Sequence, residues 1–118
     1  MQRPPEHIEI AVAGPSHLRF ADSVSRAIQR EVEKGTLGMA LRSPAMLRDK
    51  ILSGDAVFAL DRQTDDWAGF CYVSSWEGGT FVATSALIVR PSCRGLGVAR
   101  RLKDLSFGTG RRRYPGAR

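Results

Sequence analysis

The chain has 118 residues, of which 42% are hydrophobic and 25% are charged, and this composition is typical of a single globular domain over residues 1–118. No apolar run approaches the roughly 18 residues of a membrane-spanning helix, and the first residues lack the apolar core of a secretory signal, so we expect a cytoplasmic protein. The two cysteines and two histidines are too scattered for a zinc site, and both cysteines are expected to be free thiols.

The positive charge is concentrated near the C-terminus. Residues 1–93 carry ten basic and eleven acidic side chains, whereas residues 94–118 carry eight basic side chains and one acid, Asp104. This imbalance indicates an anionic ligand, either a phosphorylated cofactor or a nucleic acid, and a solubilising surface is the alternative. Phe107 and Tyr114 are the aromatic residues of the basic segment, which is a poor stacking platform for nucleic acid bases.

The first part of the chain predicts one strand and two helices. Alternating apolar residues predict a strand over residues 7–13. Apolar residues then recur every three or four positions over residues 18–32, which predicts an amphipathic helix. A Ser-Pro pair at residues 43–44 is a typical helix start, so a second helix is expected over residues 45–52.

Three strands are expected next, over residues 55–60, 67–75 and 80–89, with a Gly-rich turn at residues 77–79 between the last two. The third of these strands becomes wholly apolar at residues 87–89, so we expect that end to be buried on both faces.

A third helix is expected from Val98 onward, with Leu102 and Leu105 on its apolar face. Gly108 and Gly110 are expected to weaken it. The predicted order is β-α-α-β-β-β-α, which indicates a mixed α/β (α+β) fold.

The segment most informative about function is residues 87–102, where an apolar strand end, a short loop and an amphipathic helix follow one another. Gly95 and Gly97 lie where the strand turns into the helix, so the backbone there can approach a ligand closely. Free N–H groups and the helix dipole favour a phosphate at such a position, and Arg94, Arg100 and Arg101 add positive charge. The segment therefore predicts a site for a diphosphate.

Two common phosphate-binding motifs do not fit this segment. A dinucleotide-binding fingerprint has a third glycine and an acidic residue about 20 positions later, and the chain has Arg100 after Ala99 and no acid over residues 111–118. A Walker loop requires Gly-Lys-Ser/Thr, which is also absent from the segment.

The run Arg94-Gly95-Leu96-Gly97-Val98-Ala99, which follows Val89-Arg90-Pro91 and precedes Leu102, resembles the acetyl-CoA-binding segment of the GNAT N-acetyltransferase superfamily. The predicted order of elements is similar to the first two thirds of that fold, which has a mostly antiparallel sheet. The resemblance covers residues 87–102 by motif and nearly the whole chain by element order.

This resemblance implies direct transfer of an acetyl group from acetyl-CoA to a primary amine of a small molecule or amino acid, without a metal. The strand that carries the site is bulged in the family, and the pantetheine arm would pair with Leu87, Ile88 and Val89. An N–H near Ile88 or Val89 would stabilise the oxyanion. The diphosphate would lie on the amides of Gly95, Leu96, Gly97, Val98 and Ala99. Arg94, or Arg100 and Arg101, would meet the diphosphate or the 3′-phosphate.

The resemblance also implies a general base and an acceptor site. Glu77 is the acid nearest to the strand that forms the site and is the candidate base, and a solvated acid in a hairpin turn is the alternative. Arg42 lies in the region that lines the acceptor pocket, where it would bind a carboxylate, and an exposed loop arginine is the alternative.

The family fold continues with another strand, a helix and two more strands, so the resemblance implies that this chain is truncated before the fifth strand. The strand over residues 80–89 would then have an unpaired edge, through which two copies could form a homodimer. The alternatives to a transferase are a non-catalytic remnant that binds CoA or pairs through its sheet edge, and a small basic nucleic-acid-binding module.

Overall fold

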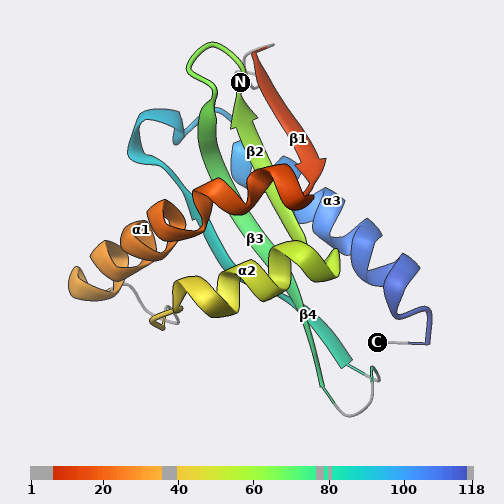
Figure 1. Ribbon diagram of the computed structural model, residues 1–118. Helices are drawn as coiled ribbons and strands as arrows, with labels where there is room; N and C mark the ends of the chain where they lie inside the picture. The colour runs from red at the N-terminus through yellow and green to blue at the C-terminus, as the bar shows by residue number, and fades with distance from the viewer. Residues whose placement is uncertain (1–6, 36–39, 77–78, 80, 117–118) are drawn as a thin grey trace.

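A four-stranded antiparallel sheet with the strand order β1-β2-β3-β4 lies between two layers of helices (Figure 1). The computed structural model describes residues 7–35, 40–76, 79 and 81–116. The strands are β1 (Ile8–Val12), β2 (Ala56–Asp61), β3 (Asp66–Trp76) and β4 (Phe81–Val89).

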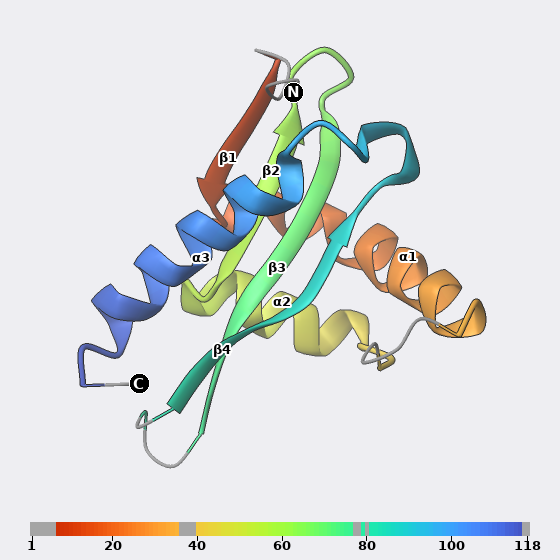
Figure 2. The same cartoon turned by 180° about the vertical axis from the view of Figure 1, so that it is seen from behind.

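Helices cover both faces of this sheet. Figure 1 shows α1 and α2 on one face, and Figure 2 shows α3 crossing the other. The bounds are α1 (Ala21–Glu33), α2 (Pro44–Ser53) and α3 (Val98–Arg113). The predicted mixed fold and element order are confirmed.

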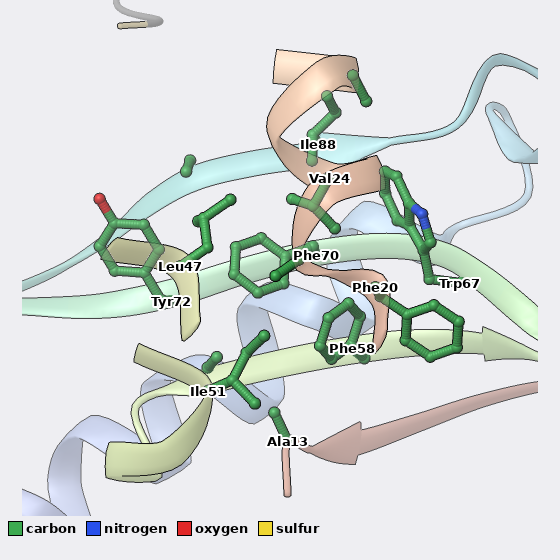
Figure 3. Packing of buried hydrophobic residues seen from close by; sticks show 14 of the residues in the cluster. Ala13, Phe20, Val24, Leu47, Ile51, Phe58, Trp67, Phe70, Tyr72 and Ile88 are labelled. Atoms are coloured by element: carbon green, nitrogen blue, oxygen red, sulfur yellow. The ribbon is translucent and has the colours of Figure 1, made fainter. Parts of the chain in front are cut away.

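The alternation of strand side chains divides the core into two clusters, one on each face of the sheet. The larger cluster lies under α1 and α2 and includes Phe58, Phe70 and Tyr72 (Figure 3). The smaller cluster lies under α3 and includes Cys71 and Leu102. Both cysteines are free thiols, as expected.

Local sequence signals explain where the first two helices begin. A short 3-10 helix, η1 (Pro15–Phe20), precedes α1, so the helix predicted from residue 18 begins with 3-10 rather than α geometry. The Ser43 hydroxyl accepts a hydrogen bond from the Met46 N–H at 3.1 Å, which is the predicted cap of α2. Gly54 has φ 88° directly after that helix and lets the chain leave it in the left-handed region.

The two glycines that are expected to weaken α3 do not end it, because the helix is continuous through Gly108 and Gly110 to Arg113. Tertiary contacts fix its C-terminal end. The Arg113 Nε donates to the buried carboxylate of Asp55 at 2.7 Å, and the Tyr114 hydroxyl lies 3.4 Å from both oxygens of the same carboxylate. These contacts outweigh the low helix propensity of glycine.

Strand β4 is bulged and lies at the edge of the sheet. Tyr72 pairs with Ser85 and Phe70 pairs with Ile88, so β4 contains one residue more than β3 over this stretch. Ala86, within the bulge, has φ 54°. The bulge that the family resemblance implies is therefore present.

The expectation that residues 87–89 are buried on both faces is wrong in part. Ile88 is buried in the larger cluster, whereas Leu87 and Val89 are half-buried. These two residues lie on the face toward α3, where the sheet ends at β4 and the helix covers them incompletely. Within the described ranges no helix has both the length and the apolar character needed to cross a lipid bilayer.

Candidate functional site

The glycine loop, residues 94–97, connects the end of β4 to the start of α3 (Figure 2). It follows a single turn of 3-10 helix, η2 (Pro91–Cys93). Gly95 and Gly97 have φ values of 81° and 77°, in the left-handed region that favours glycine. The two glycines therefore allow the abrupt turn that brings the first residue of α3, Val98, beside the end of β4.

A cavity of about 300 Å³ lies between the glycine loop, the first turn of α3 and the C-terminal end of β4. We call it the loop cavity. Seven of the ten residues predicted to bind the cofactor line it, together with Cys93. The seven are Leu87, Val89, Arg94, Gly95, Gly97, Val98 and Ala99.

The other three predicted cofactor residues do not line this cavity. The Ile88 side chain points into the core beneath α1 (Figure 3). Leu96 packs on the cluster beneath α3, and Arg100 is exposed in the first turn of that helix. The structure therefore brings together the loop glycines and alternate residues of the strand.

The direction of the β4 backbone groups follows from the pairing with β3. The Arg90 N–H donates to the Ala68 carbonyl at 2.8 Å, and successive residues of an antiparallel strand point their backbone groups to opposite sides. The amide of Ile88 therefore faces β3, and the backbone groups of Leu87 and Val89 face the free edge. Of the two amides predicted to meet a thioester carbonyl, that of Val89 lies on the accessible side.

The start of α3 adds hydrogen-bond donors to the loop cavity. The Arg101 N–H donates to the Gly97 carbonyl at 3.3 Å, so the N–H groups of residues 98–100 precede the first helical hydrogen bond. The positive end of the helix dipole lies at the same place. Arg100 and Arg101 are exposed beside these donors. The arrangement suits a diphosphate.

Arg94 spans the space between the loop cavity and α1. Its Nε donates to the Val89 carbonyl at 3.0 Å, and its Nη2 lies 3.3 Å from a Glu31 carboxylate oxygen. Lys34 approaches the same Glu31 oxygen at 3.2 Å. The hydrogen bond from Lys34, and to a lesser degree that from Arg94, lowers the pKa of Glu31. Residue patterns alone do not single out Glu31, because a lone acid on a polar helix face is ordinary.

Arg42 is half-buried and has specific partners. Its Nε donates to the Tyr72 hydroxyl at 2.7 Å, and its carbonyl accepts from the Ser25 hydroxyl at 2.6 Å. Tyr72 is paired with Ser85, next to the bulge in β4. The Lys50 Nζ lies 5.0 Å from the centre of the Tyr72 ring. Tyr72 and Lys50 were not predicted to belong to a site, because strand spacing alone accounts for the tyrosine.

The predicted base, Glu77, lies outside the described residues, so its role stays a prediction. The described part of β4 begins at Phe81. The Thr84 hydroxyl is 2.9 Å from the Ser106 hydroxyl of α3, and this hydrogen bond links β4 to the helix.

The sequence matches no protein-family model and no curated protein. Solved structures nevertheless match the fold. N-acetylglutamate synthase from Neisseria gonorrhoeae, complexed with coenzyme A and N-acetyl-glutamate, is similar over 91% of this chain, with 18% identity and a TM-score of 0.69. A GCN5-related N-acetyltransferase from Sphaerobacter thermophilus is similar over 97% of this chain, with 18% identity and a TM-score of 0.65.

The protein named mosquito arylalkylamine N-acetyltransferase like 5b is similar over 89% of this chain, with 12% identity and a TM-score of 0.71. The present chain spans 23% of the Neisseria protein, 35% of the Sphaerobacter protein and 71% of the mosquito protein. At these identities the likeness is one of fold.

Proposed function

Since the chain has the fold of the GNAT N-acetyltransferases, we propose that it binds acetyl-CoA in the loop cavity and takes part in acetyl transfer to a primary amine. The observation that carries this proposal is the loop cavity itself, in which Gly95, Gly97, Leu87 and Val89 come together. The Neisseria structure with the same fold contains coenzyme A, which supports the choice of ligand.

The residues present suit the diphosphate, the pantetheine arm and the thioester of that ligand. The N–H groups of residues 98–100 and the helix dipole favour its diphosphate. The outward backbone groups of Leu87 and Val89 suit the amides of its pantetheine arm, because they can extend the sheet by hydrogen bonds of the strand type. Acetyl-CoA supplies the thioester that an amine attacks, and the Val89 N–H is the proposed donor to the carbonyl oxygen as it gains charge.

An amine attacks only in its neutral form, so a base must accept its proton. Glu77 remains the proposed base. The proposal predicts that Glu77→Gln lowers kcat while leaving the affinity for CoA unchanged, because the residue would contact the amine and not the cofactor. A weaker affinity for CoA with an unchanged kcat would contradict this role.

Isothermal titration of the protein with CoA tests the binding proposal. We expect saturable binding by the wild type and none by Gly97→Trp, whose side chain would fill the loop cavity and strain the backbone at φ 77°. Gly35→Trp is the matched control, because Gly35 has φ 81° and no described atom beyond its chain neighbours lies within 4 Å of an added Cβ. Equal binding by the two variants, or no saturable heat with the wild type, would overturn the proposal.

For the acceptor we propose an amino acid or another amine that carries a carboxylate, bound by Arg42. The Neisseria protein with this fold was solved with N-acetyl-glutamate, which supports that class. The hydrogen bond between Arg42 and Tyr72 holds the guanidinium near the bulge of β4. Arg42→Gln is expected to raise KM for a carboxylate-bearing amine and to leave KM for a neutral amine unchanged.

A second proposal is that the free edge of β4 pairs with another strand, for which a homodimer is the simplest case. The Val73 N–H donates to the Asp55 carbonyl at 2.9 Å on the β2 side, so alternation places the backbone groups of Val82 and Thr84 on the free edge. A cavity of about 220 Å³ lies along this edge, and it is lined by Val82, Thr84 and residues of α3 that include the 54% exposed Phe107.

Sedimentation velocity over a wide concentration range tests this pairing. A homodimer through the edge predicts an increase in sedimentation coefficient with concentration, and Val82→Pro should abolish it because proline removes an outward N–H. A monomer at every concentration would contradict the homodimer.

A further inference from the structure

We propose that Glu31 is a positioning residue that holds Arg94 across the outward carbonyl of Val89, so that CoA must displace this arginine in order to bind. The inference rests on the proposed function. Glu31 belongs to α1, on the face of the sheet opposite α3, and lies outside the sequence segment that resembles a cofactor site.

The contacts of Arg94 place its guanidinium between the strand and α1. One end of the group donates to the Val89 carbonyl at 3.0 Å and the other end lies 3.3 Å from Glu31. The Glu31 side chain is 16% exposed and that of Arg94 is 46% exposed, so the acid is the less exposed of the two. Glu31 therefore restricts where the arginine can reach.

The Val89 carbonyl is the acceptor that a pantetheine amide would need. It faces the free edge of β4, beside the backbone groups of Leu87, and Arg94 already donates to it. Arg94 also lines both the loop cavity and a smaller cavity of about 40 Å³ against α1. A ligand that runs along the edge must compete with Arg94 for this carbonyl.

The charges around Glu31 indicate what kind of ligand would separate Arg94 from Glu31. Arg30, Lys34, Arg90 and Arg94 line the smaller cavity together with Glu31. Arg90 is paired with Asp66 at 2.5 Å, and Lys34 shares the Glu31 carboxylate with Arg94. A diphosphate at the start of α3 carries more negative charge than one carboxylate, so it would draw Arg94 away from Glu31 and uncover the Val89 carbonyl.

This arrangement predicts a gain of affinity from the loss of an ion pair. Glu31→Gln keeps the side-chain shape but weakens the hold on Arg94, so CoA should bind about two- to fivefold more tightly, within the range expected for one partly exposed ion pair. Glu33→Gln is the matched control, because it removes the same charge from the same helix at a residue that contacts Gln29. Its affinity for CoA should equal that of the wild type.

A double-variant cycle separates positioning from a change in overall charge. In an Arg94→Gln background, Glu31→Gln should no longer increase affinity, because the group that it positions is gone. A gain that persists in this background, or a Glu31→Gln variant that binds CoA no more tightly than Glu33→Gln, would overturn the inference.

A measurement without CoA distinguishes this inference from the proposed function. In the wild type the Arg94 Nε–H is engaged by the Val89 carbonyl, so its exchange with water, followed by NMR, should be slow, and Glu31→Gln should accelerate it. Equal exchange rates in the two proteins would reject the role of Glu31 whether or not CoA binds. Absence of CoA binding with faster exchange in the variant would reject only the proposed function.

Discussion

Asp55 is the buried acid on which the C-terminal end of α3 depends. It is 5% exposed, and it accepts from Arg113 at 2.7 Å while Lys50 lies 3.7 Å away. The hydrogen bond to Asp55 is the main reason that the pKa of Arg113 is raised. A carboxylate buried to this degree is stable only with such partners.

Asp55→Asn should therefore destabilise the protein by about 2 kcal/mol, because it removes charge-assisted hydrogen bonds inside the fold. Urea denaturation measures the change. Asp104→Asn, the same substitution at an exposed position of α3, should change the free energy of unfolding by less than about 0.5 kcal/mol. Similar values for both variants would show that Asp55 does not anchor the helix.

The buried thiol of Cys71 should make the free energy of unfolding depend on pH. Burial raises the pKa of its thiol to about 12, whereas the thiol of an unfolded chain titrates near 8.5. Between these values the unfolded state has lost the proton and the folded state retains it. The contribution of Cys71 is therefore fully present below about pH 8.5 and declines as the pH rises, by up to about 1.4 kcal/mol per unit.

Urea denaturation at pH 8 and pH 10 checks this prediction. Wild type should lose up to about 2 kcal/mol more than Cys71→Ala between the two pH values. Cys93→Ala retains the buried thiol of Cys71 and should follow the wild type. An equal loss in wild type and Cys71→Ala would contradict the prediction.

At the scale of elements, the bulge in β4 separates two parts of the free edge. Before the bulge, Val82 and Thr84 lie along the 220 Å³ cavity, and after it Leu87 and Val89 line the loop cavity. Ala86 has φ 54°, a conformation that costs free energy for any residue with a Cβ. This strained residue lies beside the proposed cofactor site, where the bulge sets the direction of the strand end.

Ala86→Val tests how much the bulge matters. A β-branched side chain is poorly tolerated at positive φ, so we expect a loss of about 1–3 kcal/mol in the free energy of unfolding and weaker binding of CoA. Ala83→Val is the control, because Ala83 lies in the same strand in regular pairing and is exposed. Its stability should be near that of the wild type, and an equal loss in both variants would show that the bulge is not the cause.

At the scale of the whole molecule, ligand binding should be coupled to folding, because the loop cavity joins elements that are distant in sequence. The C-terminal end of β4 and the start of α3 form it, and Arg94 ties it to α1 through Glu31. CoA at one hundred times its Kd should raise the free energy of unfolding by about 2.7 kcal/mol. Thermal denaturation with and without CoA measures this, and Gly97→Trp should show no shift.

Much of this architecture was predicted from residue patterns. The strands over residues 55–60 and 67–75 and the cap at Ser43 follow from hydrophobic periodicity and from local hydrogen bonding, which neighbouring residues decide. The continuity of α3 through Gly110 was not predicted, because it depends on Asp55, more than 50 positions earlier.

The sequence by itself determined the element order and the glycine loop, because turns, caps and left-handed backbone at Gly95 and Gly97 depend on adjacent residues. Only the tertiary structure decided which strand residues face the free edge, that Arg94 is shared between Val89 and Glu31, and that Arg42 meets Tyr72. These contacts join residues that are far apart in the chain. Strand register, the β4 bulge and side-chain packing bring those residues together, and no local sequence pattern encodes these three features.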